Sequence, residues 1–265
     1  MSEGRLQIQQ QDGVLCATLD RPDKLNALDL PMWQGLWEVT RRLASDDSVR
    51  VLLIRANGRY FSAGIDLHGA LAPDPALTSS LDFRQWYRQG TGSLHALGDE
   101  WEAIGKPVVV AHQGPCLGGA LELSLCADFR LASTEARYGL PEIMLGGIPG
   151  SGGTSRLVRL AGTHWARWLI LANKQVSAQQ AQSIGIVHEI FEPDRLEQEA
   201  MDFCQSLVTL PREAFAAGKL AIELAADLDR AQARNVERLA VSGLIGGQEF
   251  RDMMTAMQER LAGKR

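Results

Sequence analysis

Short apolar runs alternate with stretches of helical periodicity through the first two thirds of the chain. The apolar runs are rich in β-branched residues, as in buried strands, and they span 14–19, 51–54, 108–111 and 185–191. Residues 31–44 open with a proline and repeat apolar side chains three and four positions apart, which predicts an amphipathic helix. A strand, helix, strand order favours an α/β fold.

The pattern changes near residue 195, where the strand signals stop. Three helical segments follow, at 195–208, 212–226 and 229–262. We therefore expect two parts: residues 1–195 hold the core and the active site, and residues 196–265 form a helical C-terminal region.

The composition is typical of a globular protein of enzyme size. Of 265 residues, 45% are hydrophobic and 22% charged, which suffices for one large core or a core with a small appended domain. The net charge of -5 argues against a general affinity for nucleic acid, because phosphate binding needs a basic face. Neither a secretory leader nor an apolar run of membrane-spanning length is present, so we expect a soluble, cytoplasmic protein with no membrane partner.

The sequence carries no fingerprint of a metal or nucleotide cofactor. Its four cysteines are scattered without a C-x-x-C pair, which favours buried free thiols over a zinc site or disulfides. Gly150 and Gly152 are followed by Ser155 where a dinucleotide fingerprint needs a third glycine, and no Gly-Lys-Ser/Thr occurs. We therefore expect neither metal, NAD nor ATP.

Small residues are concentrated in three segments that follow strands, at 61–67, 114–122 and 146–154. A glycine turn that leads into a helix presents unpaired N–H groups at the positive end of the helix dipole. Such a turn can stabilise an oxyanion. Taken alone, each turn is more often a tight strand-to-helix connection that has no chemistry.

Taken together, five short segments resemble the crotonase superfamily, the relatives of enoyl-CoA hydratase and isomerase. They are Leu19-Asp-Arg-Pro-Asp-Lys-Leu-Asn-Ala-Leu28, 61–67, 114–122, Leu140-Pro-Glu142 and 150–157, and the match spans at least residues 14–190. The resemblance implies a spiral of repeated ββα units that forms two roughly perpendicular sheets. It also implies that the C-terminal helices assemble the chain into homotrimers or hexamers, as dimers of trimers.

The resemblance places two oxyanion-hole donors on the main chain, at the N–H groups of Ile65 and Gly119. Both donors would stabilise the enolate-like oxygen that forms on a thioester carbonyl. Removing one such donor typically costs on the order of 3 kcal/mol. An acyl-CoA thioester is therefore the implied substrate, and coenzyme A enters as part of it rather than as a cofactor.

The resemblance also assigns acid and base roles to Glu122 and Glu142. Without it, Glu122 reads as a charge at a helix N-terminus and Glu142 as a solvated loop charge. Hydratases of the family hold a water between two such glutamates. One acts as base on the water that attacks the β-carbon while the other supplies the α-proton, and we expect Glu142 to be the α-proton donor.

Coenzyme A contacts are implied near the first two matching segments and at the start of the helix that bears Glu122. The expected residues are Lys24, Ala27, Ala63, Asp66, Leu67 and Gly118. Two positions depart from the family pattern. His68 stands where several hydratases carry lysine, and Met257 stands where a phenylalanine is common.

The reaction itself is open among chemistries that share an enolate. Two glutamates, and glycine rather than aspartate at position 150, favour hydration of the α,β double bond. The long segment 66–106, with a loop over 68–80 and with Trp86, Tyr87 and Trp101, is similar to dienoyl-CoA isomerases. An enoyl-CoA or dienoyl-CoA isomerase therefore stays as the alternative, and a non-catalytic acyl-CoA-binding trimeric scaffold as the alternative of another class.

Overall fold

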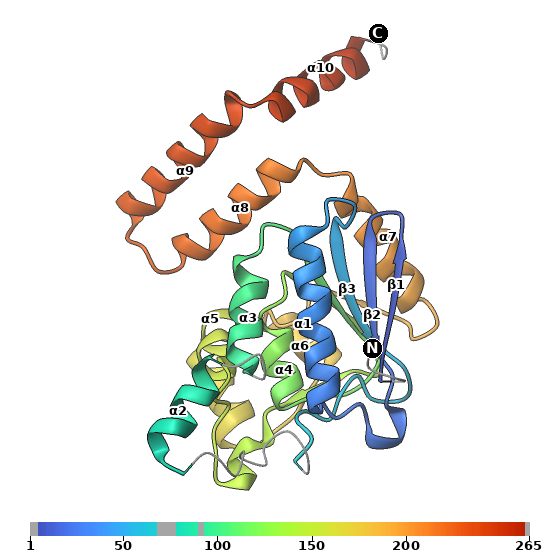
Figure 1. Cartoon of the computed structure of the whole chain (residues 1–265), viewed down its shortest axis with the longest axis vertical. Coiled ribbons are helices and arrows are strands. Elements are labelled where there is room, and N and C mark those ends of the chain that lie inside the picture. The colour runs from blue at the N-terminus through green and yellow to red at the C-terminus, as the bar shows by residue number, and fades with distance from the viewer. Residues whose placement is uncertain (1–4, 68–77, 90–92, 263–265) are drawn as a thin grey trace. The chain divides into compact units, whose positions relative to one another are not determined.

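The computed structural model describes residues 5–67, 78–89 and 93–262 (Figure 1). The chain divides into two compact units. The first comprises residues 1–102 and 107–208, and the second comprises residues 103–106 and 209–265. Within the described residues, no helix is both long and apolar enough to cross a membrane.

The first unit is built on a six-stranded sheet in the order β1-β2-β3-β4-β6-β9. Its strands are β1 (Leu6–Gln11), β2 (Val14–Leu19), β3 (Val51–Ala56), β4 (Val108–His112), β6 (Phe129–Ser133) and β9 (Glu189–Phe191). The β1–β2 pair is an antiparallel hairpin and the other neighbours are parallel. Three of the expected strands are thereby present.

The fourth expected strand, 185–191, is only partly extended. Strand β9 begins at Glu189, because the preceding residues close the end of helix α6 (Ala178–Ser183). Gly185 adopts a φ of 86°, and the N–H groups of Ile186 and Val187 donate to the carbonyl of Ala181. Ile186 and Val187 are buried, so the apolar run reflects the core and not a strand.

A second sheet of three short strands contains β5 (Cys116–Leu117), β7 (Arg137–Gly139) and β8 (Val176–Ser177). Each of the first two follows a strand of the large sheet and leads into helical structure. Thus β4 and β5 precede α4 (Gly119–Ser124), while β6 and β7 precede η2 (Pro141–Leu145) and α5 (Gly153–Ala166). This repeated ββα order is the one that the resemblance implies.

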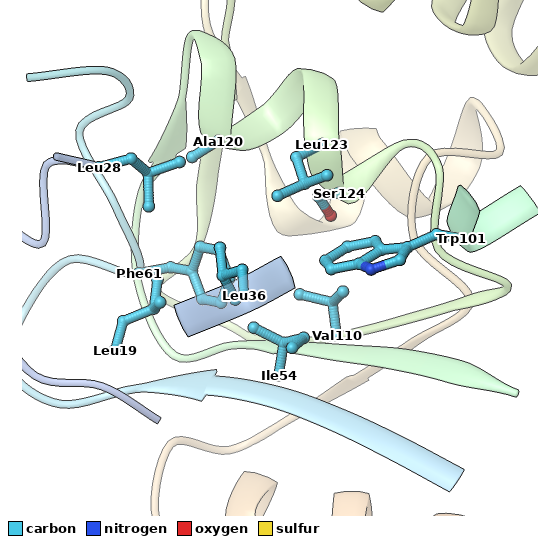
Figure 2. A pocket seen from close by; sticks show the side chains of 10 residues that line it. All are labelled: Leu19, Leu28, Leu36, Ile54, Phe61, Trp101, Val110, Ala120, Leu123 and Ser124. Carbon is cyan, nitrogen blue, oxygen red and sulfur yellow. The ribbon is translucent and has the colours of Figure 1, made fainter. Parts of the chain in front are cut away.

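The two faces of the large sheet are covered by different helices. Helix α1 (Leu30–Ser45) begins at the N-cap Asp29, whose side chain accepts a hydrogen bond from the Met32 N–H, and it includes the predicted 31–44. Helix α7 (Leu196–Val208) buries apolar side chains against Leu53 and Val109. The adjacent Ile54 and Val110 lie on the α1 side, together with Leu36 of α1, because successive strand residues alternate between faces (Figure 2).

Because of the packing of α7, the boundary between the two units lies later in the sequence than we predicted. We predicted a boundary after residue 195, whereas the first unit continues to Val208. Four α7 side chains, Leu196, Ala200, Cys204 and Leu207, belong to the same buried cluster as the strands. A helical pattern alone does not reveal which partner a helix covers.

Helix α4 rests on apolar packing that contains a small cavity of about 10 Å³ (Figure 2). Leu36, Ile54, Val110, Trp101 and Leu123 contribute to its wall. This volume is close to that of one water-sized probe, so the cavity does not hold a substrate.

The polar groups of that wall are already bonded. The Trp101 indole N–H donates to the Thr40 hydroxyl, and the Ser124 hydroxyl lies 2.9 Å from His112 Nε2. Burial lowers the pKa of His112 to about 3, so its ring is neutral. Together these contacts fix the packing on the side of α4 that faces the cavity.

The remaining helices of the first unit are short or flank the site. They are η1 (Pro22–Lys24), α2 (Ser80–Gln89), α3 (Leu94–Ala103, whose last residue belongs to the second unit) and η3 (Arg167–Leu171). Helices α2 and α3 make up most of the described part of the long segment 66–106.

The second unit contains helices α8 (Arg212–Ala225), α9 (Arg230–Ile245) and α10 (Gln248–Ala262). The single helix predicted over 229–262 is wrong, since it is interrupted at Gly246 and Gly247. Large apolar side chains of α9 and α10 are exposed in the chain alone, Met257 among them. The assembly of this region into trimers or hexamers stays a prediction.

Candidate active site

A pocket of about 360 Å³ lies within the first unit, among turns that are far apart in the sequence. Residues 63–67, 118–122 and 141–151 supply most of its wall, and Tyr87 of α2 supplies the remainder. The three glycine-rich segments and both glutamates identified in the sequence therefore meet in one place.

The first wall is the turn at Gly64, which lies directly against the backbone of the segment before α4. Gly64 has a φ of 102°, and a Cβ there would lie 2.9 Å from the Leu117 carbonyl oxygen. Only glycine allows this approach. The neighbouring bridge to Leu28 uses the N–H of Asp66 and the carbonyl of Gly64, so the N–H of Ile65 takes no part in it.

The second wall is the N-terminus of α4. The N–H of Gly118 donates to the Gly139 carbonyl at 2.9 Å, whereas Gly119 is the first helical residue, where N–H groups lack a partner within the helix. The Ile65 side chain covers Gly119 so closely that an added Cβ would lie 2.7 Å from Ile65 Cγ1. Ile65 and Gly119 thus lie on adjacent turns that line the pocket.

Glu122 lies in the first turn of α4, is 3% exposed and is held by backbone donors. Its Oε2 accepts from the N–H of Ser151 at 2.7 Å and of Gly153 at 3.0 Å. Burial, with a smaller contribution from the nearby Glu142 charge, raises the pKa of Glu122 to about 7. The two backbone hydrogen bonds and the Arg156 charge oppose this rise.

Glu142 lies on η2 and lines the same pocket as the Gly64 turn. Its Oε1 lies 3.1 Å from the place of an added Cβ on Gly118. Within the described residues, its buried Oε2 has no hydrogen-bond partner, and burial raises the pKa of this carboxyl as well. Burial thus raises the pKa of both carboxyls, which is typical of acid and base groups in active sites.

The residues expected to contact coenzyme A fall into two groups. Ala63, Leu67 and Gly118 line the pocket. Lys24, Ala27 and Asp66 are absent from its wall, and Lys24 is exposed on η1. His68 lies outside the described residues.

Arg21 links two members of this second group, Ala27 and Asp66, through hydrogen bonds. Arg21 donates to the Ala27 carbonyl at 3.1 Å and to Asp66 Oδ2 at 2.6 Å. Its charge is therefore already paired, and Lys24 is the better candidate for a phosphate contact.

Two pocket residues were not assigned a role from the sequence. The Tyr87 hydroxyl lies 3.0 Å from the Ser151 hydroxyl and 2.8 Å from the place of an added Cβ on Gly150. Tyr87 was noted only as an aromatic residue of a long segment. Ser151 had a detectable signal, since it is the polar residue enclosed by glycines in 150–153.

Comparisons with known proteins agree with this geometry. The family model described as enoyl-CoA hydratase/isomerase matches residues 9–264. A 2,3-dehydroadipyl-CoA hydratase of Escherichia coli (strain K12) is 35% identical over 84% of this chain and 82% of its own. An enoyl-CoA isomerase/hydratase of Mycosarcoma maydis is 31% identical over 94% of this chain and 90% of its own.

Solved structures confirm the expected crotonase fold. A crystal structure of an enoyl-CoA hydratase subunit I from Geobacillus kaustophilus HTA426 superposes with a TM-score of 0.86 and 30% identity. The match covers 97% of this chain and 95% of that one. The chain therefore belongs to the enoyl-CoA hydratase/isomerase family of the crotonase superfamily, and it is an enzyme of the enoyl-CoA hydratase or isomerase type.

Proposed function

We propose that this enzyme adds water across the α,β double bond of an enoyl-CoA thioester. The observation that carries the proposal is the meeting of two carboxyls with raised pKa, Glu122 and Glu142, in one pocket with the oxyanion-hole candidates. Isomerisation needs one group that moves a proton, whereas hydration needs a base for water and an acid for the α-carbon.

The N–H groups of Ile65 and Gly119 would bind the thioester carbonyl oxygen. As the β-carbon is attacked, electrons move onto this oxygen and an enolate forms. Fixed backbone donors stabilise that charge without reorganising, and each contributes on the order of 3 kcal/mol in comparable sites. The glycine contacts of Gly64 with 117–119 support this role, because they hold the two turns together.

Glu122 would act as the base. With Oε2 occupied by two backbone donors, Oε1 remains to orient the attacking water and to take its proton. The hydroxide adds to the β-carbon, and protonated Glu142 gives its proton to the α-carbon of the enolate. Water is added overall, and a proton passed from Glu122 to Glu142 restores the starting state.

Binding of the coenzyme A portion would use Ala63, Leu67 and Gly118 at the pocket, with Lys24, Ala27 and Asp66 beside it. This chemistry needs no further cofactor. In the described residues that line the pocket, no lysine, arginine or histidine occurs, which favours an uncharged acyl group over a terminal carboxylate.

A double-bond isomerase is the second candidate. Tyr87 supports it, because its hydroxyl lies close to Gly150 and adds a further polar group beside the two carboxyls. In that reaction Glu142 alone would carry a proton between two carbons. The isomerase/hydratase relative bears both activities in its name.

The deciding experiment follows the absorbance of crotonyl-CoA, 2,3-dehydroadipyl-CoA and a 3,5-dienoyl-CoA in separate reactions. Hydratase activity bleaches the enone of crotonyl-CoA, and Glu122→Gln abolishes it while leaving acyl-CoA binding intact. Turnover of the diene alone, with full activity in Glu122→Gln, would reject hydration in favour of isomerisation. Tight acyl-CoA binding without turnover of any substrate would favour the non-catalytic scaffold.

A further inference from the structure

We propose that Arg156 is a positioning residue that sets the geometry of Glu122 through the turn at 150–153. This inference rests on the proposed role of Glu122 as base. Arg156 lies on α5 and is 9% exposed, yet it does not touch the pocket. Its guanidinium instead reaches the turn whose N–H groups hold the Glu122 carboxylate.

The contact with the turn is direct. Arg156 Nη1 donates to the Ser151 carbonyl at 3.2 Å, and the Ser151 N–H donates to Glu122 Oε2 at 2.7 Å. The Arg156 N–H also donates to the Gly152 carbonyl at 3.0 Å. The turn is therefore held by Arg156 at two successive carbonyls and by Glu122 at two N–H groups.

The other side of the guanidinium is fixed by α3. Arg156 Nε and Nη2 donate to the two Glu102 oxygens at 2.5 and 2.6 Å, which is a bidentate pair, and Nη2 donates to Asp99 Oδ1 at 2.7 Å. The arginine guanidinium is planar and its several N–H donors point in fixed directions, so it fixes the positions of its partners better than a lysine ammonium does. Arg156 thus ties the turn to a different helix.

Two glycines make room for this arrangement. Gly152 has a φ of 91°, and a Cβ there would lie 1.7 Å from Arg156 Nη1. A Cβ on Gly98 would lie 2.6 Å from Cys126 Sγ and 3.6 Å from Arg156 Nη2. The guanidinium therefore lies against the backbone of Gly152 and near that of Gly98, neither of which has a side chain.

Stability alone is a weak reason for such a group. Removing an arginine from water costs several kcal/mol, and a buried ion pair often contributes no net stability. The Arg156–Glu102 pair instead defines the direction of the Ser151 and Gly153 N–H groups that donate to Glu122. Besides Arg156, the groups that face Glu122 are Glu142 on η2, Tyr87 on α2 and Cys126, which follows the end of α4 and whose thiol donates to the Glu122 main-chain carbonyl.

The test compares Arg156→Lys and Arg156→Met with the exposed control Arg195→Met, which breaks an ion pair with Glu199 of α7. The Glu122 carboxyl is titrated by carbon-13 NMR in the full-length enzyme, with its signal assigned from Glu122→Gln. We expect the pKa of Glu122 to rise by about one in Arg156→Met, because a nearby positive charge is lost and the two main-chain donors to Glu122 are no longer held in place. We expect kcat to fall about 10- to 100-fold with KM nearly unchanged.

Arg156→Lys separates position from charge. Lysine keeps the positive charge but cannot form the bidentate pair, so kcat should fall about tenfold, with a smaller pKa change than in Arg156→Met. If Arg156→Met does not fold, the lysine variant and the milder Asp99→Asn carry the test. An unchanged Glu122 pKa and an unchanged kcat in folded Arg156→Lys would overturn the proposal. The NMR titration needs no turnover, so failure of the proposed hydration is visible separately as an inactive wild-type enzyme.

Discussion

The Tyr87 hydroxyl lies 3.0 Å from the hydroxyl of Ser151, the residue whose N–H holds Glu122. This bond joins α2 to the turn at 150–153 across one side of the pocket. Burial raises the pKa of Tyr87, so the phenol is neutral and remains a hydrogen-bond donor. Tyr87 therefore both lines the pocket and is a second anchor of the turn.

We expect Tyr87→Ala to extend the range of accepted acyl groups, because it removes a ring from the pocket wall. The ratio of kcat/KM for octenoyl-CoA to that for crotonyl-CoA should increase roughly tenfold. Tyr87→Phe is the matched control, since it keeps the ring and loses only the hydroxyl. An identical ratio in wild type and Tyr87→Ala would show that the ring does not limit the acyl group.

Glu122→Gln should make the protein more stable at alkaline pH while it removes activity. The folded-state pKa of Glu122 is raised to about 7 from an ordinary 4.5, so its stability contribution is complete below the ordinary value and is lost as pH rises through about 7. Glutamine stays neutral throughout. Since one pKa unit corresponds to about 1.4 kcal/mol, the variant should gain up to about 3 kcal/mol above pH ~8.

The measurement is the free energy of unfolding in urea at fixed protein concentration, at about pH 5 and about pH 8. Glu135→Gln, at an exposed position, serves as the control and should show little change at either pH. A Glu122→Gln protein that is equally destabilised at both pH values would contradict the buried, proton-binding state of this carboxyl.

The fold was predictable where the chain's own pattern decides it. Strands β2, β3 and β4 are mostly apolar because both of their faces are covered by helices, and the apolar periodicity of α1 directly indicates its buried face. Strands β5 and β8 have two residues each and are defined only by pairing with β7. Such pairing leaves no periodicity to detect.

The candidate site was predictable to a similar extent. Glu122, Glu142 and the glycine turns were found because their motifs are local. The donors to Glu122 were not, since backbone N–H groups 29 and 31 positions away carry no side-chain signature. Arg156 was not identified from the sequence either, because an arginine on an amphipathic helix ordinarily faces solvent.

The rate of hydration should rise with pH through the titration of the base. Glu122 accepts the proton of water only when ionised, so kcat/KM should have an ascending limb with an apparent pKa of about 7. Glu142 must be protonated to supply the α-proton, which predicts a descending limb as well, and the two apparent values describe the coupled pair. A kcat/KM that is constant from about pH 5 to 8 would remove Glu122 from the role of base.

Gly64→Ala should disable the oxyanion hole without unfolding the enzyme. The added Cβ would lie 2.9 Å from the Leu117 carbonyl, a backbone atom that cannot yield without moving the turn that leads to Gly119. We expect kcat to fall about 10²- to 10³-fold, as when one oxyanion donor is lost.

Gly162→Ala is the matched control for Gly64→Ala. Gly162 has a φ of 76°, which is similarly unfavourable for alanine, but nothing lies within 4 Å of an added Cβ. The control should lose roughly 1 kcal/mol of stability and keep its kcat, because its strain is local. If both variants lost activity equally, backbone strain rather than the displaced donors would explain the effect, and the assignment of Ile65 and Gly119 would fail.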